Sequence, residues 1–133
     1  MKNTDNEYRI TVSNRQTIDS ETAYGNYTEK NGKQYITYKT ENDGDKISSM
    51  IKIDGNEILI KRTGSVNSSM TYKVDTKKEF LYHLPYGTVP MEIETQRIVS
   101  KLDENGGTIE LVYTLMVQGE KYFNDMKITV SKR

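Results

Sequence analysis

The sequence contains no cysteine and no tryptophan, and neither sign of charge prevails, because nineteen basic residues balance nineteen acidic ones. The absence of cysteine excludes disulfides and thiolate metal sites. Balanced, dispersed charge argues against electrostatically driven binding to nucleic acid. No stretch is apolar enough to span a membrane, and the first residues contain no signal-peptide core. We therefore expect a cytoplasmic protein with neither nucleic acid nor membrane as a partner.

Apolar residues are also scarce, at 34% of the chain, whereas globular domains usually have roughly 45–50%. The core must therefore be narrow. Ten tyrosines against two phenylalanines supply most of its large rings. Because a buried tyrosine hydroxyl needs a hydrogen-bond partner or water, the composition indicates a partly polar interior.

Apolar residues recur at every second position along most of the chain, which is the period of a strand with one buried face. Asn-Gly and Asp-Gly pairs separate many of these runs and favour tight hairpins. The spacing predicts an all-β fold over residues 1–133, one domain of about ten antiparallel strands in an up-and-down barrel. The alternating apolar sets include Tyr8, Ile10 and Val12; Ile58 and Ile60; Phe80, Tyr82 and Leu84; and Ile109, Leu111, Tyr113, Leu115 and Val117.

Two segments depart from simple alternation. Between Thr88 and Leu102 the apolar residues change from odd to even positions, which predicts a β-bulge near Thr95 to Arg97. The segment from Asp19 to Tyr27 is the only one where a helix is defensible, although an extended strand suits it better. We therefore expect very little helix.

Several features spread over about two-thirds of the chain carry a resemblance to a known family. They include Gly32 with Ile36 and Tyr38, the run Ile60-Lys61-Arg62-Thr63-Gly64, the turn Pro85-Tyr86-Gly87, and the strand from Gly107 to Leu115. In their order and spacing, the sequence resembles the YwiB-like family of small bacterial β-barrel proteins. The resemblance implies a calycin-like barrel, similar to lipocalins, and implies no activity.

Arg62 is the first candidate for a ligand-binding residue. It has the same parity as Ile58 and Ile60, so a regular strand points it toward the interior. A buried guanidinium needs a partner. That partner is either the carboxylate of a ligand, bound in a bidentate fashion, or an acidic side chain or loop carbonyl of the protein itself. Arg97 follows the same reasoning, with its direction depending on the bulge.

Four tyrosines on the expected inner face could offer hydroxyls to the same ligand, unless they serve only as core packing. They are Tyr38, Tyr72, Tyr82 and Tyr113. His83, the single histidine, has outward parity, and the acidic residues show no metal-binding or acid–base spacing. We expect no catalytic residue, no metal, no cofactor and no enzymatic activity.

Two functions fit these observations. The first is a non-catalytic binding module that holds a small amphiphilic ligand in the barrel or its mouth, oriented by Arg62 and tyrosine hydroxyls. The second is an interaction or assembly module with a filled barrel, in which an outer patch meets a partner or forms a homodimer. The apolar residues of outward parity that could build this patch are Leu59, Leu81, Val112, Met116 and Phe123.

Overall fold

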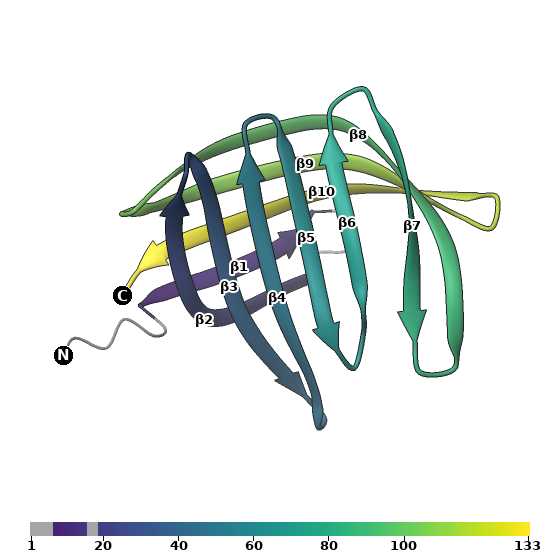
Figure 1. Ribbon diagram of the computed structural model, residues 1–133, viewed down its shortest axis with the longest axis horizontal. Coiled ribbons are helices and arrows are strands. Elements are labelled where there is room, and N and C mark those ends of the chain that lie inside the picture. The colour runs from purple at the N-terminus through teal and green to yellow at the C-terminus, as the bar shows by residue number, and fades with distance from the viewer. Residues whose placement is uncertain (1–6, 16–18) are drawn as a thin grey trace.

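The computed structural model describes residues 7–15 and 19–133 and contains ten β-strands, with no helix in those ranges (Figure 1). Accordingly, no described helix is long and apolar enough to cross a membrane. The segment from Asp19 to Tyr27 is strand, as expected. The strands are β1 (Tyr8–Asn14), β2 (Asp19–Lys30), β3 (Lys33–Asn42), β4 (Asp45–Asp54), β5 (Glu57–Gly64), β6 (Ser68–Lys73), β7 (Lys77–Leu84), β8 (Gly87–Asp103), β9 (Gly106–Val117) and β10 (Glu120–Lys132).

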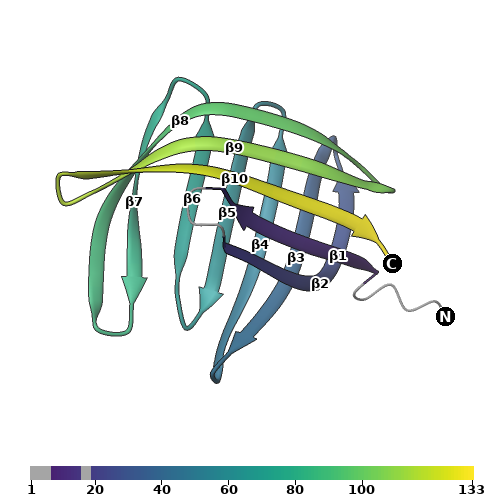
Figure 2. The ribbon, with the colours of Figure 1, turned by 180° about the vertical axis from the view of Figure 1, so that it is seen from behind.

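All ten strands belong to one antiparallel sheet in the order β6-β5-β4-β3-β2-β1-β10-β9-β8-β7. Almost every strand pairs with its neighbour in sequence, and the pairing of β1 with β10 joins the two ends of the chain. Strands β3–β6 form one side of the molecule. Strands β1 and β8–β10 cross them at a steep angle, behind them in Figure 1 and in front of them in Figure 2. This confirms an all-β, up-and-down, nearly closed barrel.

Closure is incomplete between β6 and β7. In the described part of the chain, two isolated bridges join the two ends of the sheet, Asn67 with His83 and Val74 with Thr95. The Asn67 and His83 backbones exchange hydrogen bonds of 3.2 and 2.9 Å, and the Asp75 amide donates to the Thr95 carbonyl at 3.1 Å. The two ends of the sheet are therefore joined at two points and not by a continuous ladder of hydrogen bonds.

The hairpin turns follow the chemistry expected from the sequence. Asn31 and Gly32 have φ of 55° and 77°, and Asp43 and Gly44 have φ of 53° and 86°. Positive φ at both central residues defines the type I′ turn, whose twist matches that of the flanking strands.

Strand β2 turns a corner at Gly25. Residues 19–25 pair with β1, and residues 25–30 pair with β3, so that Gly25 is paired on both sides. A Cβ at this position would overlap the Thr37 carbonyl oxygen and lie 2.8 Å from Tyr38 Cβ. Glycine is therefore required by the close approach of β3.

The predicted bulge is confirmed, since the register of β8 against β9 shifts between Thr95 and Arg97. Thr95 is fully buried, and Arg97 is exposed. The inward direction considered for Arg97 is therefore wrong, because the extra residue of the bulge turns the strand before Arg97.

The barrel interior is filled with side chains that alternate along the strands. Aliphatic residues dominate, with Tyr72 as the largest fully buried side chain. A ligand enclosed at the centre would have to displace this packing. The fully buried side chains are Tyr72, Ile10, Ile36, Ile51, Ile58, Ile60, Ile93, Ile109, Leu111, Ile128 and Thr95.

Candidate functional site

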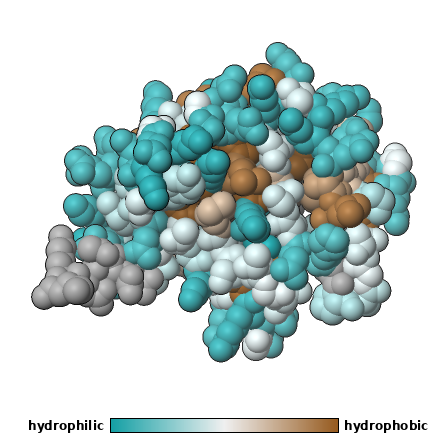
Figure 3. Space-filling model, in the orientation of Figure 1, coloured by the Kyte–Doolittle hydropathy of each residue, from teal (hydrophilic) through white to brown (hydrophobic). Residues whose placement is uncertain are grey.

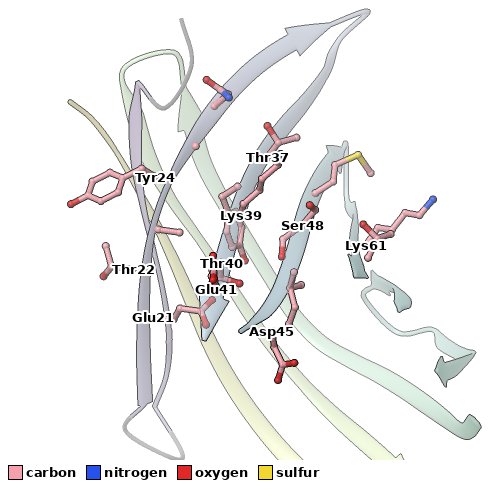
Figure 4. Close-up of a pocket in the computed structure, with 18 of the residues that line it drawn as sticks. Glu21, Thr22, Tyr24, Thr37, Lys39, Thr40, Glu41, Asp45, Ser48 and Lys61 are labelled. Carbon is pink, nitrogen blue, oxygen red and sulfur yellow. The ribbon is translucent and has the colours of Figure 1, made fainter. Parts of the chain in front are cut away.

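The corner at Gly25 opens a mouth in the barrel wall. On the N-terminal side of Gly25, residues 19–24 of β2 are paired with β1 and not with β3. Residues 39–42 of β3 are paired with β4. A cavity of about 1320 Å³ lies where the two strands separate, lined by β2, β3 and β4 with Lys61 and Thr63 of β5. Figure 4 shows Glu21 pointing from β2 toward Thr40, whereas Tyr24 points away.

Arg62 lies on the inner face beside this mouth. The strand register aligns Tyr38 with Ser49, Ser49 with Arg62, and Arg62 with Ser68 in one row across β3 to β6. Tyr38, Ser49 and Ser68 are buried, and Arg62 is half-buried. Arg62 is not itself among the cavity-lining residues, but its row neighbours Tyr38 and Ser49 are.

Within the described residues, no carboxylate lies at ion-pair distance from Arg62. Among the residues that the structure describes, the ion pairs within 4.0 Å involve Arg15, Lys33 and Lys77 as the basic partners. The groups close to the guanidinium are instead tyrosine hydroxyls, since the charge of Arg62 opposes the rise in the pKa of Tyr38, Tyr72 and Tyr113. The acidic side-chain partner considered for Arg62 is thus not found in the described chain.

Three of the four candidate tyrosines gather around this guanidinium. Burial raises the pKa of Tyr38, and the charge of Arg62 and a hydrogen bond with Ser49 partly offset that shift. Burial also raises the pKa of Tyr72 well above its usual value, with Tyr113 adding to the rise and Arg62 opposing it. The pKa of Tyr113 is raised by burial and lowered by a hydrogen bond with Tyr72 and by Arg62. The rings of Tyr72 and Tyr113 meet edge to face, with their centroids 4.9 Å apart.

Two buried hydroxyls next to this cluster have no hydrogen-bond partner among the residues that the structure describes. They are Ser68 Oγ and Thr95 Oγ1, although only 6% and 1% of these residues is exposed. Ser68 is the cross-strand partner of Arg62, and Thr95 is that of Tyr113. An unpaired buried hydroxyl costs about 1–3 kcal/mol, so each has capacity for a further hydrogen bond.

The remaining candidates lie elsewhere. Tyr82 is half-buried on β7, and the described residues show no interaction between it and the other three tyrosines. His83 is exposed as predicted, with Nδ1 3.1 Å from Thr88 Oγ1. No group of three potential metal-ligating residues occurs within the described ranges.

The tyrosine pKa shifts predict how stability responds to alkaline pH. The three buried tyrosines stay protonated at a pH where those of the unfolded chain, with an ordinary pKa of 10.0, begin to ionise. Because the folded state then binds more protons, the free energy of unfolding falls as pH rises above about 10. Arg62→Met should move these ionisations to still higher pH, measured by ultraviolet absorbance of tyrosinate. Identical titrations of the two proteins would show that Arg62 does not face this cluster.

The fold and this site define a small, nearly closed β-barrel whose mouth opens beside a polar, arginine-centred cluster. The chain belongs to the DUF1934 family, a domain of unknown function, whose model matches residues 5–130. It is 29% identical over 117 residues to the uncharacterized beta-barrel protein YwiB of Bacillus subtilis (strain 168), covering 87% of this chain and 82% of that protein. The crystal structure of the ywiB protein from Bacillus subtilis superposes with a TM-score of 0.77 at 23% identity, covering 95% of this chain and 89% of that one. This similarity supports the barrel fold predicted from the sequence.

Proposed function

We propose that the protein is a non-catalytic binding module that holds a small amphiphilic molecule in the mouth between β2 and β3, with the negatively charged group of the ligand on Arg62. The observation that carries this proposal is a half-buried arginine that has no carboxylate partner in the described chain and lies opposite Ser68, whose buried hydroxyl has no hydrogen-bond partner there either.

The donors around Arg62 suit a carboxylate. A guanidinium presents parallel N–H groups that match the two oxygens of a carboxylate, and charge-assisted bonds of this kind are about twice as strong as neutral ones. Ser68 and the hydroxyls of Tyr38 and Tyr113 can donate further hydrogen bonds from the same inner face.

The rim of the mouth restricts the charge of the ligand. Glu21 lies on the inner face, aligned with Val12, and its charge raises the pKa of Tyr38. Asp45 also lines the cavity and shares the inner face of β4 with Ile47 by strand alternation. These carboxylates repel additional negative charge at the rim, which favours a single anionic group placed at Arg62.

The less polar part of the ligand can pack in the mouth itself. Ala23 and Ile47, which have the inward parity of their strands, contribute apolar surface to the cavity, and Tyr38 lines it as well. Since the barrel centre is filled, the ligand would lie at the wall of the barrel and remain partly in contact with water.

Decanoate is a suitable probe, because it combines a single carboxylate with a short apolar chain. In amide NMR spectra, decanoate should shift signals of the mouth, such as Thr40, Ile47 and Ser49, together with Arg62. Signals on the outer face of β9 and β10, such as Lys121, should stay unchanged and serve as the internal control. Shifts confined to that outer face, or none at all, would contradict the proposal.

A further inference from the structure

The outer face of β7–β10 carries an apolar stripe that the ligand site does not involve. Register places Leu81 opposite Pro90, and Glu92 opposite Met116, so Pro90 lies diagonally next to Met116. Phe123 is opposite Thr114, which makes it the diagonal neighbour of Met116 on the other side. Leu81 and Phe123 are each 52% exposed. The stripe, consisting of Leu81, Pro90, Met116 and Phe123, therefore crosses four strands.

One end of the stripe is hollowed. A groove of about 410 Å³ is lined by Leu81, Pro90 and Met116, together with Phe80, Met91, Glu79 and Glu92. In Figure 3, hydrophobic surface is visible over β7, surrounded by hydrophilic surface. Of the five outward residues considered from the sequence, Leu81, Met116 and Phe123 belong to this stripe. The other two lie outside it, Leu59 on β5 and Val112 farther along β9, opposite Asp125 and Arg97. Contiguous exposed apolar surface with a polar border is typical of an interaction site.

The charges beside the stripe are arranged asymmetrically. Register aligns Lys121, Met116, Glu92 and Glu79 in one row across β10 to β7. Glu79 and Glu92 are directly opposite each other, a placement that is destabilising for like charges. No ion pair involves Glu79, Glu92 or Lys121 within the part of the chain that the structure describes.

We propose that this face binds a second copy of the same chain. A two-fold axis that lies in the interface, runs parallel to β9 and passes over Met116 places Lys121 of each copy opposite Glu92 of the other. The same axis makes the two apolar stripes cross at Met116. Such a self-complementary patch, apolar at its centre and with opposite charges on either side, is what an isologous dimer requires. This interface involves none of the mouth residues, so the proposed dimer does not depend on the proposed ligand binding.

Sedimentation equilibrium tests this proposal on the full chain. The wild type should be dimeric at high protein concentration, and Met116→Glu should be monomeric. Lys121→Glu and Glu92→Lys should each weaken the dimer tenfold or more, because each places like charges together twice in the symmetric interface. Lys61→Glu reverses an exposed lysine on β5 and should leave the dimer unchanged.

The double variant Lys121→Glu/Glu92→Lys tests whether Lys121 of one copy faces Glu92 of a second copy. It exchanges the two charges and should restore the dimer to near wild-type strength. A monomeric wild type at every concentration would overturn the proposal. So would single variants that weaken the dimer without rescue in the double variant, since the two residues would then not face each other. Circular dichroism of each variant shows whether it remains folded.

Discussion

Gly25→Ala should destabilise the protein by about 3 kcal/mol, because the added methyl group has no room between β2 and β3. The added Cβ would overlap the Thr37 carbonyl oxygen and approach Tyr38 Cβ to 2.8 Å and Ile10 Cδ1 to 2.9 Å. Ile10 could move its side chain, but the Thr37 carbonyl belongs to the backbone of β3. Relief therefore requires β2 and β3 to separate at the one residue where β2 pairs with both of its neighbours.

Gly119→Ala is the matched control for this substitution. Gly119 has a φ of 83°, but a methyl group added there would have nothing within 4 Å, so that the cost is backbone strain alone, about 1 kcal/mol. Urea unfolding of the wild type and both variants measures the difference. Equal losses of stability in the two variants would mean that the corner at Gly25 has room for a side chain. The close approach of β2 and β3 at Gly25 would then not be the cause of the mouth.

Arg62→Met should change ligand binding much more than folding. With no acidic partner in the described chain, removal of the guanidinium leaves no buried carboxylate unpaired, and methionine fills the volume of the arginine stem. The free energy of unfolding should therefore change by less than about 1 kcal/mol. Loss of a hydrogen-bonded charge costs binding about 1.5–3 kcal/mol, which corresponds to roughly 10- to 150-fold in affinity for decanoate.

If Arg62 is instead a structural residue, its removal should cause a much larger loss of stability. An arginine that pairs with an internal carboxylate would leave that charge buried on removal, at a cost of about 3–5 kcal/mol. Urea unfolding distinguishes the two cases without any ligand. A large loss of stability in Arg62→Met would identify the arginine as a structural residue and count against the proposed site.

Much of the fold could be predicted because its signals are local. The alternation at Ile58, Ile60 and Arg62 depends only on the strand period of two, and the β8 bulge follows from a change of parity along a single segment. Positive φ at Asp43 and Gly44 likewise follows from the residues themselves. The separation of β2 from β3 could not be predicted, because it depends on how closely two backbones approach at Gly25.

The site was predictable only in part. Parity indicated that Arg62, Tyr38, Tyr72 and Tyr113 face inward, and the structure brings them together. Tyr82 has the same parity along its own strand, but β7 lies beyond the incomplete seam and leaves it apart from this cluster.

The small hydroxyl residues of the cluster were missed. Ser68 has the parity of Met70 and Tyr72, and Thr95 has that of Ile93, so the inward signal was present in the sequence. Serine and threonine are equally common on the exposed faces of strands, however, and only the register between strands shows that these two lie next to Arg62 and Tyr113.

Calorimetric titration of decanoate and decanol into the wild type and Arg62→Met tests the central claim most directly. The two probes share a chain length and differ in the charged group that Arg62 is proposed to bind. We predict that the wild type binds decanoate at least tenfold more tightly than decanol, and that Arg62→Met removes this preference while decanol binding persists. Equal affinity of the wild type for both probes, or an undiminished preference in Arg62→Met, would contradict a carboxylate site at Arg62.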